Sequence, residues 1–181
     1  VYNHVSNAST FSQNLIVPNY FFRRDDNGNL TNGSGCGNDV ASERPMVRKF
    51  IVDSVKFWAN EYNMDGFRFD LMGLMDIRTI NEITAALKKI DPTILVIGEG
   101  WTMGTLPANQ KANQLNIQKL MGVSHFNDQI RDGIKGSVFD STDTGFATGK
   151  FGARNDVMSG IVGNVDYSTT INSKWTTAYP G

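Results

Sequence analysis

Cysteine is nearly absent from this sequence of 181 residues: Cys36 stands alone, so no internal disulfide can stabilise the fold. Long apolar runs are also missing, because the longest, at 94–97, is far shorter than the ~20 residues that cross a bilayer. Neither sign of charge dominates, since 17 basic and 18 acidic side chains leave a formal net charge of −1. This balance provides no electrostatic footprint for nucleic acid or an anionic membrane, so we expect neither partner.

Two amphipathic helices are predicted in the first half of the chain. Residues 45–62 carry apolar side chains at helical spacing, namely Val47, Phe50, Ile51, Val55, Trp58 and Tyr62. Ser42 is a candidate cap for this helix. A second apolar stripe predicts a helix over 76–90, with Asp76 as its cap. Each helix is therefore expected to bury one face against a neighbouring layer.

Strands are predicted between and after these helices. Residues 65–70 alternate with period two, and the apolar run at 94–99 is typical of a parallel strand buried on both faces. Weaker patterns predict a polar helix over about 108–120, a strand over 123–127, and helices over about 128–135 and 154–162. Alternating helices and strands favour parallel βαβ units, in either a doubly wound open sheet or a (β/α)8 barrel.

Two carboxylates, Asp70 and Glu99, stand at the ends of the first two predicted strands. Parallel strands lie about 4.8 Å apart, so these groups could approach to the roughly 5–5.5 Å of a retaining glycosidase. Arg68 shares a strand face with Asp70 and favours the ionised form that a nucleophile needs. Apolar neighbours of Glu99 would favour the proton that a general acid must hold. Alternatively, Arg68 and Asp70 form a structural ion pair, and the two acids cap the helices that follow.

Short segments of the chain resemble signature sequences of the α-amylase superfamily of glycoside hydrolases. They are Val-Tyr-Asn-His at 1–4, Asp-Gly-Phe-Arg-Phe-Asp-Leu-Met-Gly at 65–73 and Gly-Glu-Gly-Trp at 98–101. The context of the two carboxylates, together with segments 34–38, 41–46 and 126–136, is similar to type I pullulanases, the bacterial α-1,6 debranching enzymes. This resemblance runs from residue 1 to about 140.

The resemblance implies an α/β fold in which residues 1–181 form part of one catalytic (β/α)8 TIM barrel, roughly its third to sixth βα units. A long active-site loop would cover about 5–44, and about 140–181 would be irregular. The implied reaction is retaining hydrolysis of α-1,6-glucosidic linkages in pullulan, amylopectin and related branched α-glucans. The resemblance also suggests that the protein is a bacterial enzyme that is secreted or associated with the cell.

Residue roles follow from the same resemblance. Asp70 would be the nucleophile and Glu99 the acid/base of a double displacement. Substrate would be bound by His4, Arg68, Tyr2, Asn3, Asn38, Leu71 and Trp101. The resemblance gives no role to the second histidine, His125, so we expect it to be structural. Asn3 matches a calcium ligand of many α-amylases, but one neutral amide is a poor cation site by itself, so we predict no metal and no other cofactor.

Some parts of the family pattern are not found in the sequence. The family's fourth signature segment carries a His-Asp pair, whose aspartate is a third catalytic carboxylate, and this sequence contains no such pair. The sequence also opens on Val1 without an initiator methionine. We therefore expect residues 1–181 to be part of a larger protein and to hydrolyse no pullulan alone.

Other functions stay open at this point. Neopullulanase, isoamylase and branching activity belong to the same superfamily, and loops outside the sequence would decide among them. A carbohydrate-binding homologue without catalysis is a further alternative, although the presence of both Asp70 and Glu99 disfavours it.

Overall fold

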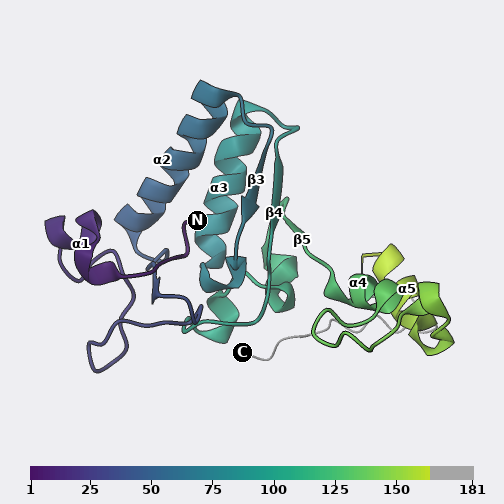
Figure 1. Cartoon of the computed structure of the whole chain (residues 1–181). Helices are drawn as coiled ribbons and strands as arrows, with labels where there is room; N and C mark the ends of the chain where they lie inside the picture. Colours follow the sequence, from purple (N-terminus) through teal and green to yellow (C-terminus); the bar gives the residue numbers. More distant parts are fainter. Residues whose placement is uncertain (164–181) are drawn as a thin grey trace. The chain divides into compact units, whose positions relative to one another are not determined.

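The computed structural model describes residues 1–163, which form two compact units. The first unit, Val1–His125, contains β1 (His4–Val5), α1 (Ser12–Ile16), β2 (Asn38–Asp39), α2 (Pro45–Tyr62), β3 (Gly66–Phe69), α3 (Ile77–Ile90), β4 (Leu95–Gly98) and β5 (Ser124–His125) (Figure 1). Described residues of the second unit, 126–163, contain α4 (Asp128–Lys135) and α5 (Arg154–Ile161). The prediction of one domain over 1–181 extends into residues 164–181, which lie outside the described part.

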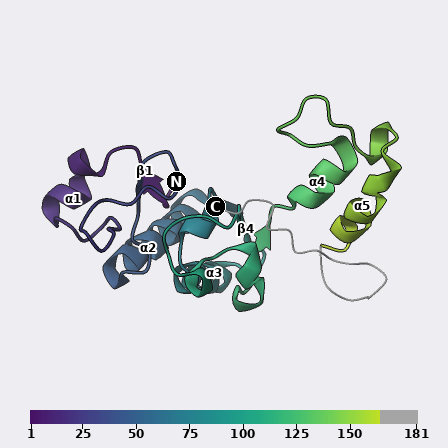
Figure 2. The same cartoon turned by 90° about the horizontal axis from the view of Figure 1, so that it is seen from below.

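The core of the first unit is a parallel sheet covered by two helices. Strands β3, β4 and β5 are parallel neighbours in that order. Helices α2 and α3 lie side by side along this sheet (Figure 2). Their buried side chains join those of the strands in one hydrophobic cluster, which includes Val47, Ile51, Val55, Ile80, Ile83, Leu87, Phe69 and Val96. The predicted parallel βαβ arrangement is thus confirmed.

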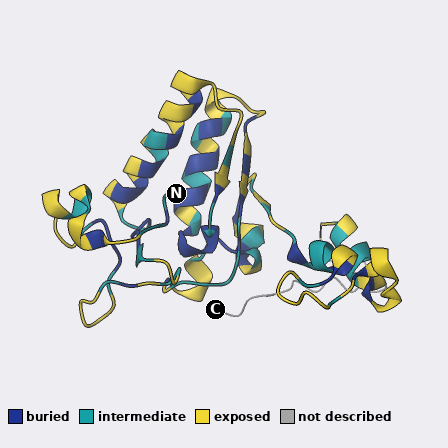
Figure 3. Ribbon diagram, viewed as in Figure 1, coloured by how far each residue is buried: buried dark blue, intermediate teal, exposed yellow. Residues whose placement is uncertain are grey.

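Only one face of β4 is buried, so the prediction of a strand buried on both faces is wrong for this structure. Val96 is 3% exposed, whereas Leu95 and Ile97 are 66% and 37% exposed. Buried and exposed residues alternate along the strand (Figure 3). Successive residues of a strand point to opposite faces, and the helices cover only the face that carries Val96. An apolar face of the sheet is therefore left open in the described residues.

Helix α2 has the predicted bounds but a different buried stripe. Its buried apolar residues are Val47, Ile51, Val55 and Ala59, which recur at intervals of four. The aromatic residues Phe50, Trp58 and Tyr62, which we assigned to the apolar face, are 46%, 40% and 56% exposed. The spacing of apolar residues alone did not distinguish the side that faces α3 from the side that faces away.

Of the two predicted helix caps, one is confirmed and one is wrong. Asp76 caps α3 by accepting a hydrogen bond from the backbone N–H of Thr79 at 3.0 Å. Ser42 does not cap α2, because Arg44 occupies the cap position without a side-chain bond. Instead, the Ser42 hydroxyl donates to Asp76 at 2.7 Å, which links the start of α2 to the start of α3.

The predicted polar helix over 108–120 is replaced by two 3-10 helices, Ala108–Gln110 and Gln114–Lys119. Asn116 explains the break: its backbone is non-helical, and its buried side-chain amide donates to the carbonyl oxygens of Ala108 and Lys111 at 2.7 and 3.0 Å. Side-chain bonds of this kind compete with the helical pattern.

The second unit confirms the two predicted C-terminal helices. Asn127 caps α4 by accepting from the N–H of Ile130 at 3.1 Å. Helices α4 and α5 pack closely, since a Cβ on Gly160 would lie 2.2 Å from the Cβ of Ile130. Within residues 1–163, no helix is both long and apolar enough to cross a membrane.

Candidate active site

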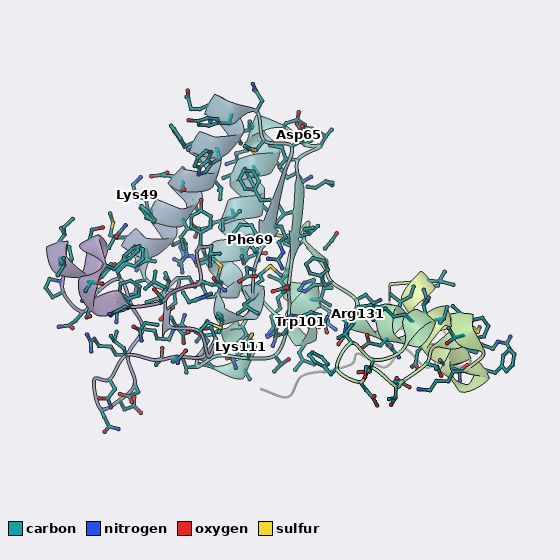
Figure 4. The ribbon with its side chains drawn as sticks, in the orientation of Figure 1. Lys49, Asp65, Phe69, Trp101, Lys111 and Arg131 are labelled. Carbon is teal, nitrogen blue, oxygen red and sulfur yellow. The ribbon has the colours of Figure 1, made fainter. Side chains whose placement is uncertain are left out.

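The sheet brings the two predicted catalytic carboxylates to the same edge. Phe69 at the end of β3 pairs with Gly98 at the end of β4, so the next residues, Asp70 and Glu99, leave the sheet side by side. The N–H of Glu99 donates to the carbonyl oxygen of Phe69 at 3.0 Å, which extends the ladder by one step. Figure 4 labels Phe69 and, beyond the same edge, Trp101.

Arg68 joins the two carboxylates. Its Nη1 donates to Asp70 Oδ1 at 2.7 Å and its Nη2 to Glu99 Oε1 at 2.6 Å. The side chains of Asp70 and Glu99 are 30% and 20% exposed, so a ligand can reach both. The prediction that Arg68 and Asp70 share a strand face is confirmed.

Glu99 is surrounded differently from what we expected. Two donors satisfy its carboxylate: Arg68 at Oε1 and the backbone N–H of Leu71 at Oε2, the latter at 2.9 Å. Leu71 has left-handed backbone angles, with φ 38° and ψ 50°. This turn directs its N–H across the strand ends toward Glu99, a contact that sequence spacing did not reveal.

The N-terminal segment lies beside Asp70. His4 in β1 pairs with Asp39 in β2, and Asn3 is 1% exposed. The Asn3 amide donates to the carbonyl oxygen of Asp70 at 2.8 Å, and His4 Nδ1 donates to Asn3 Oδ1 at 3.1 Å. His4 itself is half-buried, so its ring remains accessible, whereas Asn3 supports the site from below the surface.

Two of the predicted substrate-binding residues have structural contacts in this structure. The Tyr2 hydroxyl lies 2.7 Å from the Ser54 hydroxyl on α2, and its ring lies 6.3 Å from that of Phe69. Asn38 Oδ1 accepts from the N–H of Ala8 at 3.0 Å. The Tyr2 side chain thus ties the N-terminus to α2, whereas Asn38 joins two parts of the loop between β1 and α2.

Trp101 is half-buried and follows Glu99 by two residues. Its carbonyl oxygen lies where a side chain on Gly73 would be, because a Cβ there would approach it to 2.0 Å. The turn after Asp70 and the turn after Glu99 are therefore in direct backbone contact. Glycine is required at Gly73 for this close approach.

A buried polar cluster, which no sequence pattern predicted, holds the loop over 23–43. Asp39 is fully buried and accepts from the hydroxyl of Thr31 and the N–H of Gly33, each at 2.9 Å. Arg23 reaches both Asp39, at 3.8 Å, and Glu43, at 2.8 Å. All its members lie within residues 23–43, but their spacing follows neither helical nor strand periodicity, so the sequence pattern did not signal the cluster.

His125 packs behind the Glu99 turn, in keeping with its predicted structural role. A Cβ on Gly100 would lie 2.0 Å from His125 Nδ1, so the imidazole rests directly on that glycine. Burial lowers the pKa of His125 to about 4 from an ordinary value of 6.5. Neither ring nitrogen has a hydrogen-bond partner among residues 1–163.

The residues around Asn3 do not suit a calcium ion. Calcium takes six to eight oxygen ligands, whereas the Asn3 side-chain oxygen already accepts from His4. Within the described residues, no three His, Cys, Asp or Glu side chains gather as metal ligands.

A cavity of about 700 Å³ lies elsewhere in the first unit. Arg48, Asp76 and Glu82 line it, and neither Asp70 nor Glu99 does. Arg48 and Asp76 pair with each other at 3.2 Å, so this cavity is a groove beside structural ion pairs.

Comparison with known sequences identifies relatives, although no protein-family model matches the chain. The pullulanase of Bacillus subtilis strain 168 is 47% identical over 165 residues, which are 91% of this chain and 23% of that protein. Pullulanase 1, chloroplastic, of Arabidopsis thaliana is 38% identical over 166 residues, or 82% of this chain and 17% of that protein.

Solved structures agree with the sequence relatives. Type I pullulanase of Bacillus subtilis str. 168, complexed with maltose, matches at a TM-score of 0.89 and 46% identity, over 93% of this chain and 24% of that one. The pullulanase of Anoxybacillus sp. LM18-11, complexed with maltotriose, matches at a TM-score of 0.86 and 48% identity, over 90% of this chain and 23% of that one. The chain thus spans about a quarter of the length of these relatives.

Proposed function

This chain is homologous to type I pullulanases, and we propose that it carries the nucleophile and the acid/base of a retaining α-glucan debranching enzyme. The substrates are the α-1,6-glucosidic linkages of pullulan, amylopectin and related branched α-glucans. One observation carries the proposal: Arg68 holds Asp70 and Glu99 together at the accessible carboxyl edge of two parallel strands.

The same proposal includes the barrel. In this proposal, residues 1–181 belong to roughly the third to sixth βα units of a (β/α)8 barrel. The parallel strands β3, β4 and β5, with α2 and α3, are the consecutive elements that support it. The open face of the sheet, which carries Leu95 and Ile97, is the face that points into the interior of such a barrel. Active sites of these barrels lie at the carboxyl ends of the strands, where Asp70 and Glu99 stand.

In the first chemical step, an Asp70 carboxylate oxygen attacks the anomeric carbon of the glucosyl unit. The bond from that carbon to the bridging oxygen breaks, and Glu99 donates its proton to the departing oxygen. Asp70 needs its negative charge for this attack, and Arg68 supplies a cation at 2.7 Å that stabilises it. The product is a glycosyl ester on Asp70 and a free glucan end.

The second step restores the enzyme. Glu99, now a carboxylate, takes a proton from water while the water oxygen attacks the anomeric carbon and releases Asp70. Two inversions give net retention of the α configuration. Before substrate binds, Arg68 and the Leu71 N–H satisfy the Glu99 carboxylate, so the substrate must displace part of this network for Glu99 to act as an acid.

The experiment is the substitution Asp70→Asn in the complete gene product, assayed on pullulan. We expect nearly complete loss of turnover while substrate still binds, because an amide of the same shape supplies no nucleophile. Asp65→Asn is the matched control, since Asp65 is an exposed residue just before the opposite end of β3 (Figure 4). A fall of less than about tenfold in Asp70→Asn, or an equal fall in the control, would contradict the assignment.

Product analysis of the unaltered enzyme tests the linkage. Cleavage of pullulan at α-1,6 bonds yields maltotriose, whereas cleavage at α-1,4 bonds yields panose-type products. Branching activity would release no reducing ends. Maltotriose as the end product supports the proposal, and either of the other outcomes replaces it with another activity of the superfamily.

A further inference from the structure

We propose that Asn3 is a positioning residue: it holds Asp70 and Glu99 through the backbone of Asp70 and Leu71, and it holds His4 directly. This inference rests on the proposed function, because it assigns those three residues to one reaction. Asn3 was predicted to bind substrate, but it is 1% exposed and its polar atoms are engaged inside the protein. Its effect on the reaction must therefore pass through its neighbours.

The orientation of the Asn3 amide follows from its partners. Its Nδ2 lies 2.8 Å from the carbonyl oxygen of Asp70 and 3.4 Å from that of Leu71. Carbonyl oxygens only accept hydrogen bonds, so the NH2 group must face them and Oδ1 must face His4. One buried amide thus fixes the peptide that links the nucleophile to the next residue.

That peptide needs support because Leu71 has a left-handed backbone conformation, with φ 38°. Residues with a Cβ rarely adopt this conformation unless their surroundings impose it. Three contacts impose it here: the two bonds from Asn3 and the bond from the Leu71 N–H to Glu99 Oε2 at 2.9 Å. If Asn3 lost its donor, the turn would relax and its N–H would no longer point at Glu99.

The same amide selects the proton position on His4. Asn3 Oδ1 has no proton to give, so His4 Nδ1 carries the hydrogen of their 3.1 Å bond. In the neutral ring, Nε2 is then the nitrogen without a proton and is presented as an acceptor. Asn3 therefore determines both the placement of the carboxylates and the hydrogen-bonding character of the neighbouring imidazole.

The first test is Asn3→Asp in the complete gene product, with pullulan as substrate. Aspartate has the same shape but places a charged oxygen against two carbonyl oxygens, so the turn loses its donor. We expect kcat to fall about 10²-fold, as for a misplaced catalytic group, while KM changes less than about threefold because Asn3 touches no substrate. Asn60→Asp adds the same charge at an exposed position of α2 and is the matched control.

A second readout needs no activity. Hydrogen exchange of the Leu71 amide, followed by NMR or mass spectrometry, is expected to be slow in the unaltered protein and at least about tenfold faster in Asn3→Asp, because the bond to Glu99 opens. Asn60→Asp should leave the exchange rate unchanged. Unchanged protection in Asn3→Asp would overturn the proposal whatever the kinetics show.

Two further variants keep the test decisive if Asn3→Asp does not fold. Leu71→Val and Leu71→Asn both remove the leucine side chain, but a β-branched valine resists the left-handed conformation and asparagine tolerates it. We expect kcat of the asparagine variant to exceed that of the valine variant by about tenfold, or ~1.4 kcal/mol. Equal kcat values, or a higher value for valine, would overturn the proposal.

The outcomes separate this inference from the proposed function. If the unaltered protein cleaves no α-glucan but the Leu71 amide loses protection in Asn3→Asp, the debranching function fails and the positioning contact stands. If it cleaves pullulan and Asn3→Asp raises KM while kcat is unchanged, Asn3 is a substrate contact and the positioning role is wrong.

Discussion

Two arginine–carboxylate clusters of the first unit have the same chemical groups in opposite surroundings. Arg48 pairs with Asp76 at 3.2 Å, and their side chains are 8% and 6% exposed. Arg68 pairs with Asp70 and Glu99, and the three side chains are 46%, 30% and 20% exposed. The buried cluster is enclosed by protein, whereas the open cluster presents its carboxylates to solvent.

The two clusters differ in how far burial isolates their charges from solvent. In the buried cluster, Thr79 adds a bond to Asp76 at 2.6 Å and accepts one from Arg48 at 2.9 Å, so the charges are satisfied within the fold. Removing Asp76 would leave the buried Arg48 with only the half-exposed Glu82, at 4.0 Å, as an acidic partner. Exposed pairs are worth little to stability, so the loss of one Arg68 contact, which the proposed reaction requires, should cost the fold little. The predictions below test this division, from the largest expected effect to the smallest.

The open cluster should govern chemistry. Glu99→Gln is expected to reduce kcat on pullulan by about 10²–10⁴-fold, because a poor leaving group needs a proton from a general acid. Activated aryl glycosides, whose leaving groups need no proton, should lose much less in the first step. Equal losses on both substrates would contradict the acid role, and Glu61→Gln, exposed on α2, is the matched control.

The buried cluster should govern stability. Asp76→Ala is expected to lower the free energy of unfolding by about 3–5 kcal/mol, since it removes the nearer and buried partner of Arg48 and leaves only Glu82, at 4.0 Å, to face that buried charge. Asp53→Ala removes the exposed partner of Lys49 on α2 and should cost less than about 1 kcal/mol. Thermal and urea unfolding of the complete gene product measure the stability of both variants. A similar loss of unfolding free energy in the two would show that burial does not separate the clusters.

Burial of His125 should make the stability of the first unit depend on pH. Its pKa is about 4 in the folded protein and 6.5 ordinarily, so the unfolded chain binds more protons between these values. The contribution of His125 to stability is complete above pH 6.5 and is lost as the pH falls toward 4, by up to about 3 kcal/mol. His125→Gln should flatten the dependence of the free energy of unfolding on pH in this window, whereas an unchanged slope would show that the imidazole is not buried as described.

Changing how Arg68 holds the two carboxylates should reduce activity less than removing a carboxylate. Arg68→Lys keeps the charge but loses the planar fork that holds Asp70 and Glu99 at once. We expect kcat/KM on pullulan to fall by more than about tenfold, or ~1.4 kcal/mol. Arg78→Lys, whose exposed partner is Glu82, is the control and should leave kcat/KM unchanged. Near-normal kinetics in Arg68→Lys would leave Arg68 with a structural role alone.

Local patterns predicted much of the fold. The bounds of α2 and α4, the Asp76 cap of α3 and the parallel order of the strands follow from spacing and from short-range chemistry. Asn116 shows where such reasoning fails, because its side chain satisfies backbone carbonyls that a helix would otherwise have used. Ser42 likewise bonds a residue far along the chain in place of its own helix.

For the site, the sequence by itself determined which groups stand at the strand ends: Asp70, Glu99 and, two residues before the first, Arg68. Strand periodicity and chain order are local properties, so they place these residues without knowledge of the fold. Only the tertiary structure decided that the Leu71 N–H faces Glu99 and that Asn3 lies beneath Asp70. The first contact depends on the left-handed backbone of Leu71, and the second joins segments more than sixty residues apart. Hydrogen bonds between distant segments leave no pattern along the chain.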